Sequence, residues 1–315
     1  MFLPKVKSQI GEDISILIKL DNHSPYYLCD CGDASGLTVK ECQNIAVIFI
    51  SHTHIDHFIN FDTILRHQLG IGKQVIICGP LGITQQVQAK IKGYTWNLVE
   101  ANAISYEVRE IIDATTIQRT IIQPPTWATK ALPPLSDNLL YQNERFQVTF
   151  TILDHKIPSI AYSFKENDTV KIDLTNSDFR GGSWVRTLKT AYEKGLKETV
   201  ISIEEDQFLA KDLFHLLAVK KGDTVGIIMD HAANEANHQK IVQHFQDFNK
   251  VFIESYYLTA DKEQATLNFH SYATASGEIM QKCQVKSAVP VHFSRRYDAA
   301  EVDLLLAEFK AVYEG

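Results

Sequence analysis

The sequence lacks several features that would assign it to a specialised class of protein. None of its 315 residues lies in an apolar run of 18 or more, the length that a membrane-spanning helix needs. Its N-terminal segment lacks the basic-then-apolar pattern of a secretory signal. Its five cysteines are odd in number and scattered, unlike those of a disulfide scaffold. We therefore expect a reduced, cytoplasmic protein with no membrane partner.

An excess of positive charge is also missing. Lys and Arg number 31 against 38 Asp and Glu, which gives a formal net charge of -7. This balance argues against a protein that binds nucleic acid over its whole surface, but it is compatible with a local basic patch. The sequence has no short internal repeat and no low-complexity tract. Its composition, 45% hydrophobic and 22% charged, is typical of a soluble globular protein.

Short apolar segments alternate with longer amphipathic ones along the chain. The short segments are rich in isoleucine and valine, which predicts buried strands. The longer segments have apolar residues at helical spacing, which predicts helices. This mixture predicts an α/β or α+β layered fold, with the proline-rich segment 122–138 as a surface loop. The predicted strands are 14–20, 45–50, 74–80, 147–153, 224–230, 250–256 and 287–293, and the predicted helices are 83–93, 183–195, 237–248, 276–285 and 299–313.

Histidine is concentrated in one segment, SHTHIDHF, which runs from Ser51 to Phe58. Three of the chain's 12 histidines lie within six of its positions. The segment directly follows the predicted strand 45–50, so it lies on the loop at that strand's carboxyl end. A surface loop of solvated histidines is the alternative, but chance clustering at this density is improbable.

Three further side chains that can bind metal lie at the ends of other predicted strands: His155, Asp230 and His292. The carboxyl edge of an α/β sheet is where ligands bind, so we expect all of these groups to converge. One histidine at a strand end is usually only hydrogen-bonded, and the inference therefore rests on the shared pattern. Imidazole and carboxylate ligands suit zinc, and also manganese or iron. The set is large enough for two ions bridged by Asp230, a site that activates water and binds a phosphoryl or carbonyl oxygen.

The histidine segment matches the signature of a known superfamily. His52, His54, Asp56 and His57 fit the His-x-His-x-Asp-His pattern of the metallo-β-lactamase superfamily. Other segments resemble ribonuclease Z, the tRNA 3′-processing endonuclease, over nearly the whole chain from about Leu28 onward. The resembling segments are LCDCGDAS (28–35), CGPLGI (78–83), LDHKIPSIAYSF (153–164), IESYY (253–257) and HSYATASGEIMQKCQVKSAVPVHFSRRY (270–297).

This resemblance implies a four-layer αββα sandwich, formed by one domain over residues 1–315 with an arm inserted around 165–222. It implies two divalent metal ions, Zn²⁺ first, with Mn²⁺ or Fe as alternatives. Asp56 would also orient the attacking water or accept its proton. His270 would be the general acid, with Glu254 fixing its ring. The implied ligands are His52, His54 and His155 for one ion, Asp56, His57 and His292 for the other, and Asp230 between them.

The sequence departs from the ribonuclease Z pattern at several positions. The Pro-x-Lys-x-Arg-Asn loop, which serves tRNA handling and catalysis in that family, is missing from residues 1–22. Ile253 stands where the family has a histidine before the glutamate, and Ala161 replaces the glycine before Tyr162. His231 is an additional imidazole directly after Asp230.

A cluster of basic residues lies in the segment that corresponds to the family's tRNA-binding arm. Residues 179–197 contain five Lys or Arg against one Glu, although 165–221 as a whole is balanced at ten of each sign. One interpretation is an element that grips phosphates, and the other is a solvated helix face. The candidate substrate-binding residues are Arg180, Arg186, Lys189 and, near the C-terminus, Arg296.

The sequence therefore predicts a metal-dependent hydrolase, most simply a phosphodiesterase or endoribonuclease that acts on RNA or a nucleotide. The resemblance implies a tRNA precursor as substrate, and a homodimer is a further expectation. Three alternatives stay open: a hydrolase of another ester (a cyclic nucleotide, thioester or lactone), a non-catalytic nucleic-acid-binding relative, and a structural metalloprotein. The complete ligand set argues against the second, and ligands that leave positions open for water argue against the third.

Overall fold

The computed structural model of the protein describes residues 1–175 and 177–315. The chain divides into two compact units, one formed by 1–165 with 223–315 and the other by 166–222. In the chain, the second unit is inserted between strands β11 (Pro158–Glu166) and β16 (Thr224–Ile228), which pair with each other antiparallel.

The first unit contains two large sheets. The described part of the first sheet has eight strands, which neighbour one another in chain order. The second sheet runs β18-β17-β16-β11-β10-β9. The first sheet comprises β1 (Phe2–Val6), β2 (Ile16–Leu20), β3 (Tyr26–Cys29), β4 (Ile45–Phe49), β5 (Gln74–Pro80), β6 (Ser105–Ile111), β7 (Ile117–Ile122) and β8 (Thr129–Leu135). The other strands of the second sheet are β9 (Leu139–Gln142), β10 (Phe146–Asp154), β17 (Lys250–Glu254) and β18 (Ala288–Val291).

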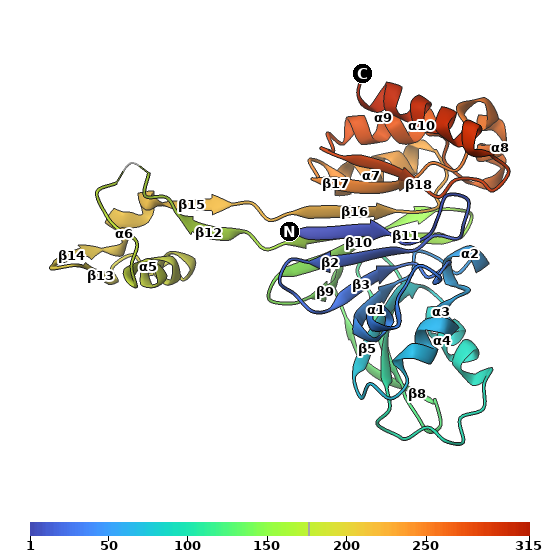
Figure 1. The fold of residues 1–315 in the computed structure, drawn as a ribbon, viewed down its shortest axis with the longest axis horizontal. Coiled ribbons are helices and arrows are strands. Elements are labelled where there is room, and N and C mark those ends of the chain that lie inside the picture. The colour runs from blue at the N-terminus through green and yellow to red at the C-terminus, as the bar shows by residue number, and fades with distance from the viewer. Residues whose placement is uncertain (176) are drawn as a thin grey trace. The chain divides into compact units, whose positions relative to one another are not determined.

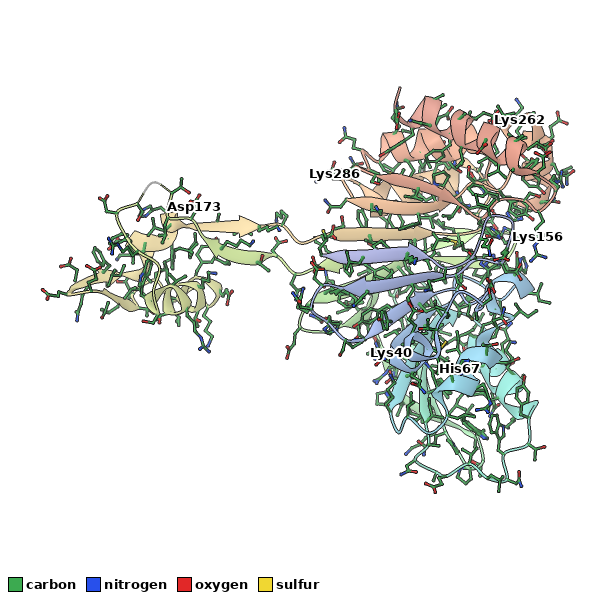
Figure 2. The ribbon with its side chains drawn as sticks, viewed as in Figure 1. Lys40, His67, Lys156, Asp173, Lys262 and Lys286 are labelled. Carbon is green, nitrogen blue, oxygen red and sulfur yellow. The ribbon has the colours of Figure 1, made fainter. Side chains whose placement is uncertain are left out.

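Apolar side chains fill the space between the two sheets and the space between each sheet and its helices (Figure 2). Between the sheets, Phe49 and Tyr162 pack with their ring centroids 5.1 Å apart. Helices α3 and α4 lie outside the first sheet, and α9 and α10 lie outside β17 and β18 (Figure 1). This arrangement is a four-layer αββα sandwich. The helices that cover it are α1 (Val39–Asn44), α3 (Phe61–Gln68), α4 (Ile83–Lys92), α7 (Glu235–Phe245), α9 (Ala273–Lys282) and α10 (Ala299–Tyr313).

Parallel strands bring several chain segments to one edge of each sheet. In the first sheet β3, β4, β5 and β6 run parallel, and in the second β16, β17 and β18 do so. Their carboxyl ends therefore meet at common edges, where loops can hold functional side chains. Two short helices follow such ends, α2 (Ile55–Phe58) and α8 (Lys262–Asn268).

Every predicted strand and helix is present, with ends shifted by up to three residues. The prediction of a loop over 122–138 is wrong, because Thr129–Leu135 forms β8. Among the described residues, β8 pairs with β7 alone, so it is an edge strand. An edge strand tolerates Pro133 and Pro134 without losing ladder hydrogen bonds on its open side. No strand was predicted for β1, β3, β6, β7, β9 or β11, nor for residues 169–172, 200–203, 206–209 and 217–220.

The second unit has a small core of its own. Trp184 and Leu188 on α5 (Trp184–Glu193) pack with Ile201 of β13 and Leu213 of α6. The amphipathic pattern over 183–195 thus correctly predicts a helix. The other elements are β12 (Thr169–Ile172) paired with β15 (Leu217–Lys220), β13 (Val200–Ile203) paired with β14 (Asp206–Leu209), and α6 (Ala210–Leu213).

Two expectations from composition concern the chain as a whole. In the part of the chain that the structure describes, no helix is both long and apolar enough to cross a membrane. The five cysteines, Cys29, Cys31, Cys42, Cys78 and Cys283, are buried free thiols.

Candidate metal centre

The histidine segment leaves β4 and enters α2 at the carboxyl edge of the first sheet. His52 and His57 are fully buried, whereas His54 is exposed and precedes α2 as its N-cap residue. The remaining predicted ligands follow strands of the second sheet. His155 comes directly after β10, Asp230 lies two residues beyond β16, and His292 comes directly after β18. Both sheets therefore contribute ligands to one site.

The seven predicted ligands form two groups. The ligand atoms within each group lie within 4.8 Å of one another. The first group is His52, His54, His155 and Asp230, and the second is Asp56, His57 and His292.

Asp230 joins the two groups through its two oxygens. Oδ2 lies 3.7 Å from Nε2 of His52 and 3.6 Å from Nε2 of His155. Oδ1 lies 3.3 Å from Nε2 of His57 and 2.8 Å from Nδ1 of His292. Each oxygen thus faces one group, as a carboxylate shared by two cations requires.

The buried polar atoms of the cluster fit divalent cations. Among the described residues, His52 Nε2 and His57 Nε2 are buried without a hydrogen-bond partner. Leaving such atoms unsatisfied costs about 1–3 kcal/mol each, a cost that a coordinated cation removes. Imidazole nitrogens and carboxylate oxygens are ligands of zinc, manganese and iron. The cluster is therefore suited to bind metal.

A second set of contacts orients the imidazole rings. Nδ1 of His57 lies 2.7 Å from Oδ2 of Asp30, and Nδ1 of His155 lies 2.7 Å from the carbonyl oxygen of Phe269. Ser51 donates to Asp30 from both its amide and its hydroxyl, each at 2.7 Å. With the Nδ1 protons engaged in this way, Nε2 of each ring faces the cluster as an acceptor.

Sequence reasoning did not identify Asp30 as a site residue. Asp30 is buried and directly follows β3, so it satisfies the same rule of a metal-competent side chain at a strand end that found His155 and His292. That rule, applied to LCDCGD, would have included it.

We expect Asp30→Asn to weaken metal binding by about 10- to 100-fold, the usual cost of losing a carboxylate that orients a ligating histidine. His57 and Ser51 both donate to the carboxylate of Asp30. The side-chain amide of an asparagine there would point its N–H group at one of these two donors, so one hydrogen bond would be lost. Competition titration with a chromogenic chelator measures the affinity. Asp33→Asn removes a nearby charge that caps the turn at Ser35, and it is the matched control. Equal affinities for the two variants would contradict the assignment.

The charges of the cluster are strongly coupled. Burial opposes protonation of His57, but the carboxylates of Asp230 and Asp30 outweigh it and raise its pKa to about 10. Burial lowers the pKa of His52, and the neighbouring charge of His57 lowers it further. Burial opposes ionisation of Asp230, but His292 and His57 outweigh it and hold its pKa well below the usual range. These shifts favour an ionised Asp230 beside a protonated His57, and a neutral His52.

A carboxylate–imidazole pair, of which the carboxylate is buried, lies beside the ligands. Nδ1 of His270 is hydrogen-bonded to Oε1 of Glu254, the last residue of β17. Glu254 is fully buried, and its Oε2 accepts from the amides of His231 at 3.0 Å and Ser271 at 3.2 Å. Glu254 is thus a buried, hydrogen-bonded carboxylate and not a solvated surface one. The ring of Tyr256 stacks on His270 at 4.0 Å, with an interplanar angle of 10°.

Opposing effects set the titration of this pair. Burial opposes ionisation of Glu254, but the charge of His270 outweighs it and lowers the pKa of Glu254 to about 2. Burial likewise opposes protonation of His270, but Glu254 outweighs it and raises the pKa of His270. A histidine with a raised pKa is a proton donor near neutral pH. Because Asp230, Glu254 and His270 also lie within 4.8 Å of one another, metal content must be measured whenever His270 is replaced.

Four residues with strained backbone lie around the site. Asp30, Lys156, Phe269 and His292 have φ of 54°, 63°, 60° and 58°. Positive φ in a residue other than glycine is costly and persists where the surrounding structure enforces it, often at functional sites.

The other residues named from sequence lie elsewhere. Arg296 stands over the ring of Tyr257, with 4.9 Å between its guanidinium carbon and the ring centroid. Ile253 and Ala161 are buried in the apolar core under the second sheet, and Nδ1 of His231 bonds the carbonyl of Met229 at 2.8 Å. The basic residues Arg180, Arg186 and Lys189 belong to the second unit.

The chain is similar in sequence to curated ribonucleases Z. It is 23% identical to the ribonuclease Z of Deinococcus radiodurans over 304 residues, which are 91% of this chain and 87% of that protein. It is 26% identical to the ribonuclease Z of Borreliella burgdorferi over 308 residues, which are 94% and 85% of the two chains. No protein-family model matches the chain. The resemblance to ribonuclease Z that the motifs indicate thus extends over about nine-tenths of the chain.

The fold is similar to solved structures of the metallo-β-lactamase fold. The metallo-β-lactamase fold protein YhfI from Bacillus subtilis superposes with a TM-score of 0.60 at 13% identity, over 100% of this chain and 94% of that one. The short form of human tRNase Z superposes with a TM-score of 0.58 at 16% identity, over 94% of each chain. The predicted αββα metallo-β-lactamase fold is therefore confirmed.

Proposed function

We propose that the protein is a metal-dependent hydrolase of phosphodiester bonds, an endoribonuclease similar in activity to ribonuclease Z. The observation that carries this proposal is two ligand groups that share Asp230, with the hydrogen-bonded Glu254–His270 pair beside them. A site of this kind can hold two cations and deliver a proton next to them. The similarity to ribonucleases Z over about nine-tenths of the chain supports RNA as the substrate class.

The residues have distinct tasks in this proposal. His52, His54 and His155 hold one cation, Asp56, His57 and His292 hold the other, and Asp230 is shared. We propose zinc, with manganese or iron as alternatives for the same ligands. Divalent ions bound there supply a Lewis acid for the phosphoryl oxygen and lower the pKa of water.

Proton transfer falls to the chain's own carboxylates and imidazoles. Asp56 is two-thirds shielded from solvent on its side chain, with Oδ2 at 3.4 Å from Nε2 of His292 and 3.7 Å from Nε2 of His57. It can accept the proton of the attacking water or orient that water. His270 donates a proton to the leaving ribose oxygen, while Glu254 holds its Nδ1 and stabilises the imidazolium.

We expect the saturated protein to bind about two equivalents of divalent transition metal per chain, because each ligand group offers at least three protein atoms to one ion. Elemental analysis of metal-saturated protein measures the ratio. His57→Ala should lower it toward one, since it removes a ligand from the second group alone. A ratio near one in the unchanged protein, with His57→Ala the same, would contradict the dinuclear site.

The second unit has the features of an RNA-binding element. α5 buries Trp184 and Leu188 in that unit's core and leaves Arg186 on its exposed face. Lys189 is partly exposed, and Arg180 lies exposed ahead of the helix. A cationic helix face of this kind neutralises phosphates. We propose that these three residues bind the RNA backbone.

Replacing Arg186 and Lys189 by alanine should weaken RNA binding and flatten its salt dependence. The slope of log affinity against log salt falls by about one unit for each lost phosphate contact. Filter binding of a tRNA precursor over a series of salt concentrations measures it. The matched control removes two lysines of the first unit, Lys262 and Lys286 (Figure 2). If the slope of log affinity against log salt is the same for the two double variants, Arg186 and Lys189 do not contact phosphates and belong to a solvated face of α5.

The substrate class is tested by offering the metal-loaded protein a tRNA precursor and bis-p-nitrophenyl phosphate. We expect cleavage of both. Cleavage of the small ester alone would favour another phosphodiester substrate, in line with the missing Pro-x-Lys-x-Arg-Asn loop. Cleavage of neither would overturn the proposed function.

A further inference from the structure

A cleft of about 380 Å³ opens beside the second ligand group. Asp56 and His292 contribute to its lining. One part of the remaining lining is apolar or aromatic, and the other part is charged. The apolar part consists of Ile55, Ile59, Phe293 and Tyr256, and the charged part consists of Glu12, Asp13 and Arg295. The side chain of Ile55 is 72% exposed, so this wall is open to a ligand.

Asp13 is held against the loop that follows β3, and that loop in turn packs on the loop of Asp56. Its carbonyl accepts from the amide of Asp33 at 3.0 Å, and the amide of Gly32 donates to the carbonyl of Ile14 at 3.0 Å. A Cβ on Gly32 would lie 1.8 Å from the carbonyl oxygen of Asp56 and 2.7 Å from Cβ of Asp13. Only glycine permits this approach, which packs Asp13 and the Asp56 loop against the same face of one residue.

Arg295 reaches this fixed carboxylate from the other end of the chain. It follows His292 by three residues, and its Nη2 forms an ion pair with Oδ1 of Asp13. The side chain of Arg295 is 67% exposed and that of Asp13 is 18% exposed. Exposed ion pairs contribute at most about 1 kcal/mol, so a stronger anion can displace the carboxylate. The planar guanidinium fork fits two oxygens of a phosphate.

We propose that Arg295 is a phosphate clamp and that Asp13 is its resting partner. When a nucleotide unit of the substrate enters the cleft, the guanidinium exchanges the carboxylate of Asp13 for non-bridging oxygens of a phosphate. The base or sugar then lies against the apolar wall formed by Ile55 and Tyr256. The clamp rests on the proposed function and deepens it, because it names a substrate-binding residue of the same site that the sequence reasoning did not identify.

A purely structural role gives a different expectation. If the ion pair served only to fasten the loop of Asp13 to the loop after β18, then breaking it from either side would impair binding alike. If Arg295 is a clamp, the two partners act in opposite directions. Loss of Arg295 removes the phosphate contact, whereas loss of the Asp13 charge frees the guanidinium.

The test is calorimetric titration of the metal-loaded protein with uridine 5′-monophosphate and, separately, with uridine. Arg295→Ala should weaken binding of the nucleotide by about tenfold, the size expected for one charge-assisted contact, and leave binding of uridine unchanged. Asp13→Asn should tighten nucleotide binding by up to about fivefold, the factor that corresponds to an exposed ion pair. The double variant should behave like Arg295→Ala, because Asp13 acts only through Arg295.

Two matched variants separate the clamp from general electrostatics. Glu12→Gln removes the same charge from the same cleft without touching Arg295, so it should tighten binding less than Asp13→Asn does. Lys262→Ala removes one positive charge on α8, outside the cleft, and should leave the affinity unchanged. Metal content and circular dichroism are recorded for each variant.

Several results would overturn the clamp. Weaker nucleotide binding in both Arg295→Ala and Asp13→Asn would show that the ion pair only fastens the two loops together. Equal effects of Asp13→Asn and Glu12→Gln on nucleotide affinity would show that the net charge of the cleft, and not the release of Arg295, sets that affinity. The titrations are independent of turnover. If the protein cleaves no phosphodiester but Arg295→Ala weakens and Asp13→Asn tightens nucleotide binding, the proposed function is wrong and the clamp stands. If the protein cleaves RNA and neither variant changes nucleotide affinity, only the clamp is wrong.

Discussion

Replacing His270 by alanine is expected to leave both metal ions bound and to slow cleavage of an RNA phosphodiester by about 10²–10⁴-fold, the usual contribution of a general acid. The ring is already bonded through Nδ1 to the buried carboxylate of Glu254, so it is held as a donor and is not free to turn. The effect should be largest for a ribose alkoxide, which must be protonated as it leaves. It should be much smaller for p-nitrophenolate, which leaves without a proton.

The measurement compares His270→Ala on an RNA phosphodiester and on bis-p-nitrophenyl phosphate, with metal content determined in parallel. Glu254→Gln should show a weaker form of the same pattern, because it keeps the ring and disturbs only its orientation and charge. His67→Ala is the matched control, since it removes a histidine of α3 that lies outside both ligand groups (Figure 2). If His270→Ala loses metal or slows both substrates equally, His270 is a ligand or a substrate-positioning residue.

Asp230→Asn is expected to abolish activity and to weaken metal binding in both ligand groups together. The carboxylate lies within 3.7 Å of His52, His57, His155 and His292, so its charge offsets that of both cations at once. The loss of affinity should be roughly 100-fold or more, which is larger than the loss expected for a residue that only orients a ligand. The amide keeps the volume of the side chain, so a loss of this size reflects the missing charge.

Metal titration distinguishes Asp230 from the ligands that serve one group. His57→Ala should weaken one binding event, whereas Asp230→Asn should weaken both. Asp303→Asn on the exposed side of α10 removes one carboxylate far from the ligand set and is the control for net charge. Two binding events of unchanged affinity in Asp230→Asn would show that the carboxylate is not shared.

Local pattern was sufficient to identify most of the site. The residues His52 to His57 were recognisable because a strand of isoleucine and valine ends directly before them, and the same rule found His155, Asp230 and His292. Strand ends are local features, and parallel strands place their carboxyl ends on one edge whatever their order in the sheet. Residue type and position along each strand therefore determined the kind of site and its edge.

Contacts between distant segments were decided only by the tertiary structure. The loop prediction over 122–138 failed because proline, which signals a loop, is also compatible with an edge strand such as β8. The position of a strand in a sheet cannot be read from its local sequence. Three such contacts are the hydrogen bond between Glu254 and His270, the contact of Asp30 with His57, and the ion pair between Asp13 and Arg295. The partners lie 16, 27 and 282 positions apart in the sequence.

The two oxygens of Asp230 show the same division. The sequence by itself determined that a carboxylate follows β16 among several imidazoles, because both the strand and the residue types are local. Which oxygen faces which ligand group depends on how the first sheet's histidine loop stacks over the edge of the second sheet. That stacking is set by the apolar side chains packed between the sheets, and no single segment of the chain contains it.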